Sequence, residues 1–277
     1  MPELPEVETI RRSLTAIRGA TITSVAFGAF TGCIAHPEPP EFQQAITGCR
    51  VESVGRRGKY LLLVLNSGDT IAVHLRMTGE LTVANAGAPL PPHHHLALIL
   101  DNGRELRFKD TRKFGRLWLL DAAGLSMLDR SLGPEPLSRD LTAERFVTML
   151  RSRRRAIKPL LLDQTFIAGI GNIYADEALF AAGIHPLRPA DSLTEEEAGG
   201  LLAAIQDLLS SAIRRNGTTI RDYRNAFGEP GTNQDYLRIY RQEAGAPCPR
   251  CGTPVLRLVV AQRGTKLCPA CQPALAI

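Results

Sequence analysis

The sequence of 277 residues lacks any apolar run that approaches the roughly 20 residues needed to cross a bilayer. It also lacks the basic start and apolar core of a signal peptide, because Glu3, Glu6 and Glu8 occupy that segment. Both absences argue against a membrane or exported protein and predict a cytoplasmic location. Hydrophobic residues make up 44% and charged residues 22%, as in an ordinary globular protein of one large or two smaller domains.

Basic residues are in slight excess, with a formal net charge of +5 and a sequence pI of about 9.0. This balance favours a polyanionic partner, although net charge alone is a weak indication. Arginines concentrate at 151–155 and again at 214–224. Each cluster is compatible with a solvated helix face as well as with binding to a polyanion.

The first half of the chain is predicted to be rich in β-strands. Turn sequences at 66–69 and 101–103 separate short apolar or alternating runs, as in hairpins. Strands joined so closely should be antiparallel and form a sandwich or barrel. The predicted strands are 21–27, 51–54, 60–65, 70–75, 96–100, 104–108 and 116–120. A helix should precede them, with Pro5 in its first turn and an apolar stripe formed by Val7, Ile10, Leu14 and Ile17.

The composition changes at 133–136, where two prolines and a glycine mark a predicted domain boundary. Helical patterns follow at 142–151, 157–164 and 172–182, the last ended by Gly183. A fourth helix should begin at the capping box of Thr194 and Glu197 and end at Asn216-Gly217.

Four of the six cysteines form two Cys-x-x-Cys pairs, namely Cys248, Cys251, Cys268 and Cys271. Two such pairs on neighbouring hairpins predict one tetrahedral Zn²⁺ with four protein ligands, which makes the metal structural. Two disulfides or a redox motif are the alternatives, and disulfides are disfavoured without an export signal. Cys33 and Cys49 stand apart and are interpreted as buried small apolar residues.

The N-terminal segment allows two interpretations. In the first interpretation, the segment is a simple lead-in to a helix, with acidic residues that complement the helix dipole. Alternatively, removal of Met1 would leave Pro2 as a terminal secondary amine. Such an amine has a pKa of about 8, far below that of lysine, and it can attack an anomeric carbon to form an imine. Glu3 beside it could then transfer protons.

Seven segments, taken together and in order, resemble the formamidopyrimidine-DNA glycosylase family. They are MPELPEVET at 1–9, GKYLLL at 58–63, HLRMTG at 74–79, DTRKFG at 110–115, GIGNIYADEALF at 169–180, the segment 217–219, and AQRGTKLCPACQ at 261–272. The resemblance implies an α+β protein of two domains. An N-terminal helix and antiparallel β-sandwich (2–133) would be followed by a helix–two-turn–helix DNA-binding domain (134–240) that ends in a zinc finger (241–277).

The resemblance also implies roles for individual residues. Pro2 corresponds to the nucleophile, Glu3 to the general acid and base, and Glu6 to a supporting carboxylate. Lys59 corresponds to a lysine that contacts phosphate and transfers protons, although a lysine at the start of a strand is often simply solvated. Arg263 corresponds to the zinc-finger arginine that grips phosphates around the flipped nucleotide. Further DNA contacts correspond to His74, His93, Arg154 and Asn172.

Three more residues correspond to the side chains that fill the gap left by a flipped base, namely Met77, Arg112 and Phe114. An apolar wedge unstacks bases, and an arginine can pair with the orphaned partner base. Without the resemblance, core packing would be the better interpretation of Met77 and Phe114.

The predicted function is base-excision repair by a bifunctional DNA glycosylase and abasic-site lyase. It would remove 8-oxoguanine and formamidopyrimidines from duplex DNA through an imine at Pro2, followed by β- and δ-elimination. The partner is damaged or abasic duplex DNA, the cofactor one structural Zn²⁺, and the protein a monomer associated with the nucleoid. An enzyme like endonuclease VIII, acting on oxidised pyrimidines, is the first alternative, and PELPE at 2–6 argues against it. A non-catalytic zinc-ribbon DNA-binding protein is the second, and it would need neither Pro2 nor Glu3.

Overall fold

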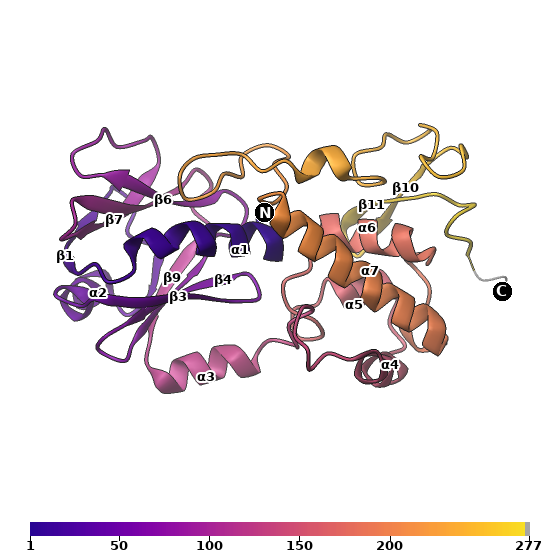
Figure 1. The fold of residues 1–277 in the computed structure, drawn as a ribbon, viewed down its shortest axis with the longest axis horizontal. Helices are drawn as coiled ribbons and strands as arrows, with labels where there is room; N and C mark the ends of the chain where they lie inside the picture. Colours follow the sequence, from indigo (N-terminus) through magenta and orange to yellow (C-terminus); the bar gives the residue numbers. More distant parts are fainter. Residues whose placement is uncertain (275–277) are drawn as a thin grey trace. The chain divides into compact units, whose positions relative to one another are not determined.

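The computed structural model describes residues 1–274 and divides into two compact units (Figure 1). Unit 1 consists of Met1–Ser131 and Arg215–Gln234, and unit 2 of Leu132–Arg214 and the chain from Asp235 onward. None of the helices within residues 1–274 has the length and apolar composition that crossing a bilayer requires.

Unit 1 is built on two β-sheets. The five-stranded sheet has the order β2 (Ile34–His36), β9 (Arg116–Leu120), β5 (Thr70–His74), β4 (Tyr60–Leu65) and β3 (Val51–Arg57). The four-stranded sheet has the order β1 (Ile22–Phe27), β7 (His94–Leu100), β8 (Arg104–Asp110) and β6 (Gly79–Asn85). Neighbouring strands are antiparallel except β2 and β9, which are parallel. Apolar side chains from both sheets form one core, which confirms the predicted sandwich.

Helix α1 (Leu4–Ser13), extended by the 3₁₀ turn η1 (Leu14–Ile17), packs against the sandwich at β3 and β4. Its predicted stripe is confirmed, because Val7, Ile10, Leu14 and Ile17 are all buried in the core. Pro5 lies in the first turn, where a missing N–H costs nothing. The N-terminus is thereby held at one end of the sandwich.

The segment Arg215–Gln234 returns to unit 1 after the helices of unit 2. Tyr223 and Ala226 belong to the core of the sandwich, and Val83 N of β6 donates a hydrogen bond to Ala226 O at 2.8 Å. The packing therefore groups these residues differently from the predicted domain 134–240. Contacts between residues so distant in sequence do not show in any local pattern.

Unit 2 consists of helices around α6 (Asn172–Ala182), which is buried on nearly all sides. The other elements are α4 (Ala143–Arg151), α5 (Ile157–Leu161), η2 (Ala190–Ser192), α7 (Glu195–Arg214), β10 (Leu256–Val260) and β11 (Arg263–Leu267), and η3 (Asn233–Tyr236) lies where the chain re-enters this unit. The predicted helix ends are confirmed by the left-handed backbone of Gly183, Asn216 and Gly217. The predicted capping box is also present, because Glu197 N lies 3.1 Å from Thr194 Oγ1 and Thr194 N 2.9 Å from Glu197 Oε2.

Among the elements that had no prediction are β2, α2 (Pro39–Ile46), β6 and α3 (Ala122–Arg130). Helix α3 buries no residue and is capped by Asp121, whose side chain accepts from Gly124 N at 2.7 Å. Its apolar side chains Leu125 and Leu128 are only half-buried. The predicted helix 157–164 was too long, because Asp163 forms a turn by accepting from Thr165 N at 3.0 Å.

Candidate active site and zinc centre

The N-terminus of α1 is buried. Pro2 and Glu3 have little exposed surface, and Glu3 is the N-cap residue of the helix. Glu3 and Glu6 form a capping box in which Glu6 Oε2 accepts a hydrogen bond from Glu3 N at 2.8 Å. The backbone next to Pro2 is therefore fixed by a carboxylate.

Glu6 also joins the N-terminus to the returning segment of unit 1. Its Oε1 accepts a hydrogen bond from Thr218 N at 2.8 Å, and its backbone oxygen accepts one from the Tyr223 hydroxyl at 3.3 Å. Gly217 precedes Thr218 with φ of 81°, and a Cβ there would lie 3.2 Å from Glu6 Oε1. Only glycine combines that backbone with so close an approach.

Replacement of Glu6 by glutamine should lower stability. One amide oxygen cannot accept from both Glu3 N and Thr218 N in the same way, and the new NH₂ group would face a donor. Leaving a buried donor unsatisfied costs about 1–3 kcal/mol, or a melting temperature lower by roughly 2–10 °C. Thermal unfolding measures this effect. The control is Glu52→Gln, which removes one exposed ion pair with Arg50, and equal melting temperatures for both variants would contradict the assignment.

Lys59 lies in the two-residue turn between β3 and β4, after Gly58 with φ of 54°. Its side chain is only 4% exposed, so the interpretation of Lys59 as a solvated lysine at a strand start is wrong. The ammonium group lies close enough to the chain end to affect its ionisation.

The amine at the chain end has a pKa below its ordinary value. Burial is the main cause and Lys59 adds to it, while the charges of Glu3 and Glu6 act in the opposite direction. A lowered pKa means that the unprotonated, nucleophilic form persists to lower pH than at an exposed chain end. In the full chain this amine belongs to Met1, and removal of Met1 would make the nitrogen of the buried Pro2 the chain-end amine.

His74 ends β5 and is buried against Tyr60, with ring centroids 4.7 Å apart. Burial, together with the charges of Arg76 and Lys59, lowers its pKa to about 3. Its Nδ1 accepts a hydrogen bond from Arg76 N at 3.0 Å, so the neutral ring carries its proton on Nε2. The ring can thus serve as a neutral donor to an anion.

Met77 and Phe114 are exposed at 38% and 49%, so the core-packing interpretation is wrong for both. Met77 lies in the loop between β5 and β6, and Phe114 in the loop between β8 and β9. The Arg112 guanidinium stacks on the Phe114 ring, with its Cζ 4.8 Å from the centroid. Arg112 and Phe114 thus form one projecting cation–π pair.

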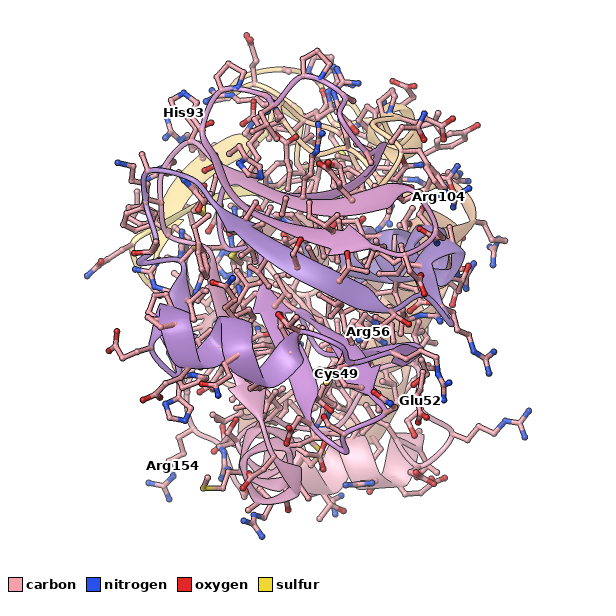
Figure 2. The ribbon with its side chains drawn as sticks, turned by 90° about the vertical axis from the view of Figure 1, so that its left-hand side faces the viewer. Cys49, Glu52, Arg56, His93, Arg104 and Arg154 are labelled. Atoms are coloured by element: carbon pink, nitrogen blue, oxygen red, sulfur yellow. The ribbon has the colours of Figure 1, made fainter. Side chains whose placement is uncertain are left out.

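His93 and Arg154 are both exposed, as Figure 2 shows for each side chain. His93 has φ of 63°, and its carbonyl oxygen accepts a hydrogen bond from Asp110 N at 3.1 Å. Arg154 belongs to the turn between α4 and α5 in unit 2.

Asn172, at the start of α6, lies beside the hairpin that carries Arg263. Its Nδ2 donates to Gly264 O at 3.1 Å, next to the exposed Arg263 at the start of β11. The same hairpin also contacts a buried lysine, Lys158, for which the sequence suggested no role. Lys158 Nζ lies 2.6 Å from Thr265 Oγ1 and 2.6 Å from Asp176 Oδ1.

The four predicted zinc ligands lie together in unit 2, with all four sulfur atoms within 4.8 Å of one another. The distance between Sγ atoms is 3.9 Å from Cys248 to Cys271 and 3.5 Å from Cys251 to Cys268. A tetrahedron with Zn–S bonds of about 2.3 Å has edges of about 3.8 Å, so the thiols fit one structural Zn²⁺. The alternative of two disulfides is wrong, because none of the four cysteines forms a disulfide.

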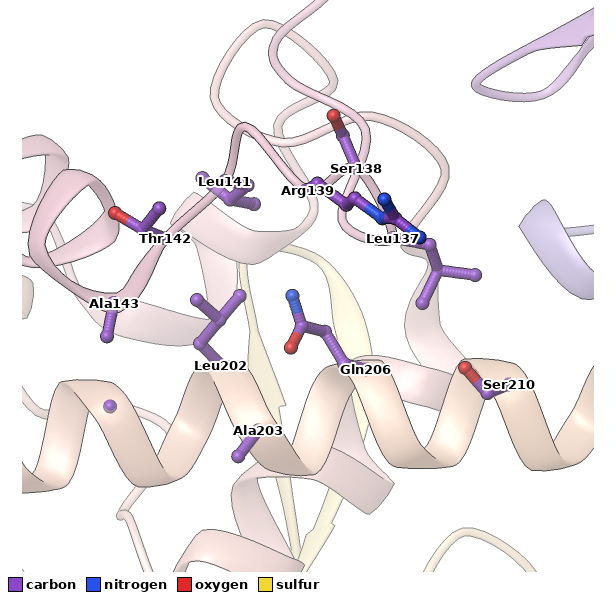
Figure 3. Close-up of a pocket in the computed structure, with 11 residues that line it drawn as sticks. Leu137, Ser138, Arg139, Leu141, Thr142, Ala143, Leu202, Ala203, Gln206 and Ser210 are labelled. Carbon is purple, nitrogen blue, oxygen red and sulfur yellow. The ribbon is translucent and has the colours of Figure 1, made fainter.

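A cavity of about 530 Å³ lies in unit 2 between the start of α4 and helix α7 (Figure 3). None of the predicted site residues is among those that line it. Its Gln206 side chain already donates to Pro136 O at 3.0 Å, and most of its other walls are leucine, alanine or glycine. This cavity is therefore not part of the predicted site.

Comparison with known protein families matches nearly the whole chain. Residues 1–117 match the formamidopyrimidine-DNA glycosylase N-terminal domain, residues 132–224 its H2TH domain, and residues 245–274 a zinc finger found in FPG and IleRS. The chain belongs to the formamidopyrimidine-DNA glycosylase family. A family member from Roseiflexus is 53% identical over 98% of this chain and 100% of its own length. One from Chloroflexus aggregans is 50% identical over 98% of both chains.

Solved structures of the same family have the same fold. A variant of the Lactococcus lactis enzyme in complex with DNA containing Fapy-dG superposes with a TM-score of 0.92 at 36% identity, covering 99% of this chain and 100% of that chain. The L. lactis enzyme with DNA containing an abasic site superposes with a TM-score of 0.91 at 36% identity. The match covers 98% of this chain and 100% of that chain. The two-domain α+β fold with a terminal zinc finger, predicted from the sequence, is confirmed.

Proposed function

We propose that this protein excises oxidised purines, 8-oxoguanine and formamidopyrimidines, from duplex DNA and then cleaves the strand. The observation that carries the proposal is the buried N-terminal segment, where Pro2, Glu3 and Lys59 are all buried and Glu3 and Lys59 both act on the charge at the chain end. The names of the relatives and the DNA lesions bound in the solved structures support it.

Pro2 is the proposed nucleophile once Met1 is removed. Its nitrogen lone pair attacks C1′ of the damaged nucleotide, and the base leaves with the electron pair of the glycosidic bond and gains a proton. Because proline is a secondary amine, loss of its own proton and opening of the sugar give a cationic iminium. Glu3 is the proposed proton donor and acceptor for these transfers.

The iminium then acts as an electron sink for two eliminations. Loss of a proton from C2′ expels the 3′ phosphate, and a further proton loss expels the 5′ phosphate. Hydrolysis of the iminium returns the Pro2 amine. Lys59 is the proposed contact to phosphate and carrier of protons in this stage, and its buried turn keeps its ammonium group near the chain end.

The remaining predicted residues are proposed to hold the DNA. Phosphates would contact His74, Asn172 and Arg263, with Zn²⁺ keeping the hairpin of Arg263 rigid, and His93 and Arg154 would make further DNA contacts. Met77, Arg112 and Phe114 would fill the gap left by the flipped base. We further propose the domain division 2–133, 134–240 and 241–277, a monomeric state, and a nucleoid-associated location in the cytoplasm.

Arg263 and Arg112 should affect binding in different ways. Each phosphate contact adds about one unit to the log–log salt slope, whereas a base contact adds roughly 1–3 kcal/mol of discrimination. Arg263→Ala should weaken binding to every duplex and flatten the slope. Arg112→Ala should mainly abolish the preference for cytosine over adenine opposite the lesion. Salt titrations with both opposite bases measure this, and a flattened slope with intact preference in Arg112→Ala would contradict gap filling.

An excision assay tests the proposed function. Duplexes with 8-oxoguanine opposite cytosine should release the free base and leave phosphates at both ends of a one-nucleotide gap. Release from duplexes with an oxidised pyrimidine at a higher rate would favour the alternative that resembles endonuclease VIII. Binding without any base release would favour a non-catalytic DNA-binding protein.

A further inference from the structure

Asp110 ends β8 and is fully buried, yet it has no part in the proposed chemistry. Its carboxylate accepts hydrogen bonds from two separate loops. Oδ1 accepts from Thr78 Oγ1 at 2.5 Å and from Arg112 N at 3.1 Å. Oδ2 accepts from Gly115 N at 2.7 Å. Hydrogen bonds to an ionised acceptor are stronger than those between neutral groups.

The two loops are those that carry the proposed gap-filling side chains. Residues 75–79 form a tight turn around Met77, closed by the hydrogen bond from Gly79 N to Leu75 O at 2.9 Å. Residues 111–115 carry Arg112 and Phe114. Arg112 N also lies 3.2 Å from Thr78 Oγ1, so the threonine hydroxyl connects both loops directly.

Both loops contain a glycine at a close approach to neighbouring atoms. A Cβ on Gly115 would lie 2.6 Å from Phe108 Cζ and 3.2 Å from Asp110 Oδ2. A Cβ on Gly79 would lie 2.4 Å from Leu75 O. Neither position has room for a side chain, so both loops depend on glycine at these close approaches.

The backbone of Asp110 holds a third segment. Asp110 N donates to His93 O at 3.1 Å, and Asp110 O lies 2.8 Å from Nε2 of the buried His95. Met77 and Phe114 are exposed at 38% and 49%, so packing of their own side chains fixes their directions only in part. The backbone that carries them therefore contributes to their orientation, and this backbone is held at Asp110.

We propose that Asp110 is a positioning residue that, together with Thr78, keeps the Met77 loop and the Arg112–Phe114 loop in one fixed arrangement. The three gap-filling side chains then enter the duplex as a preformed unit, and binding does not have to order two independent loops. This inference rests on the proposed function, which assigns gap filling to these three residues.

Two variants test the arrangement. Thr78→Val keeps the shape of the side chain but removes the hydroxyl between the loops, while Asp110 keeps its backbone donors. Asp110→Asn replaces one acceptor oxygen by a donor group that faces backbone N–H groups. Thr47→Val is the matched control, because it removes one threonine hydroxyl hydrogen bond, to Gln43 O at 2.7 Å, at the end of α2.

Single-turnover rates should be measured on two substrates. One is duplex DNA with 8-oxoguanine opposite cytosine, and the other is a single-stranded oligonucleotide with an abasic site, which has no partner base and no gap. One lost hydrogen bond corresponds to a change of up to about tenfold in rate. We expect Thr78→Val to be about tenfold slower on the duplex, and Asp110→Asn about a hundredfold slower because its bonds to both loops are disturbed. Both variants should stay within about twofold of the unmodified protein on the single strand.

A second readout does not need catalysis. A duplex with a stable abasic analogue opposite 2-aminopurine reports unstacking by fluorescence, and both variants should give a smaller increase than Thr47→Val. If Thr78→Val loses rate equally on both substrates, or on neither, the positioning role is wrong, and this decides the question even if Asp110→Asn fails to fold. Absence of excision by the unmodified protein would instead overturn the proposed function itself.

Discussion

Pro2→Gly should reduce excision of 8-oxoguanine from duplex DNA by at least about a hundredfold. Glycine would still offer a terminal amine, but without the ring that is buried beside Glu3, and with a backbone that is free to rotate. A displacement of about 1 Å at a reacting atom costs roughly a hundredfold in rate. The primary amine would also give an imine that can lose its proton and its charge, which weakens the electron sink. Binding to the lesion should persist, because no phosphate contact is changed.

Single-turnover excision and equilibrium binding measure this prediction, with removal of Met1 confirmed by mass spectrometry. Pro39→Gly is the control, because Pro39 lies at the first position of α2 in the same unit and is distant in sequence from the amine. Excision close to that of the unmodified protein, with Met1 confirmed absent, would remove Pro2 from the mechanism.

Cys251→Ser should release the zinc and unfold the terminal hairpin. The two strands β10 and β11 form a sheet on their own, and a two-stranded hairpin is marginal in water. The apolar cluster beneath them is small, with Phe180, Ile239 and Val255 next to two of the cysteines. Structural zinc contributes on the order of 10 kcal/mol to such modules, so the loss of one thiolate should exceed what this cluster can offset.

Affinity for duplex DNA should then fall by about ten- to a hundredfold, because the phosphate contacts of the hairpin would be lost. Metal analysis and equilibrium binding give the two readouts, with Cys49→Ser as a control that changes a half-buried cysteine in unit 1. Retention of one zinc per chain together with full affinity in Cys251→Ser would contradict the structural role of the metal.

Features set by local periodicity could be predicted from the sequence. The stripe of α1, the hairpin turns of the sandwich and the helix ends at Gly183 and Gly217 each depend on neighbouring residues, and the structure has them where expected. Strand β6 escaped prediction because Leu81 and Val83 are its only two large apolar residues, so its apolar–polar alternation is short. Helix α2 escaped because it is short and begins with two prolines.

The residues that organise the site were harder to predict from the sequence. Asp176 and Glu177 are buried charges in an otherwise apolar helix, and that contrast was visible in the sequence. Their partners were not visible, because they lie far away in the sequence. Asp176 pairs with Lys158, and Glu177 accepts hydrogen bonds from the backbone of residues 238–240. The bond between Glu6 and Thr218 spans 212 residues, a separation at which no periodic pattern carries information. In the sequence, Asp110 stood out only as the first residue of the motif DTRKFG. Its contacts with both loops could be recognised only in the folded structure.

Trapping with borohydride tests the central claim, that the chain-end amine at Pro2 is the nucleophile, most directly. The protein, with Met1 shown to be absent, is mixed with duplex DNA containing 8-oxoguanine opposite cytosine, and the product is reduced and digested with protease. If the Pro2 amine forms an iminium with C1′, reduction should give a stable adduct. Its N-terminal peptide should carry the sugar on the nitrogen of Pro2. An adduct on a lysine, Lys59 included, or no adduct from a preparation that releases the base, would contradict the assignment of Pro2 as the nucleophile.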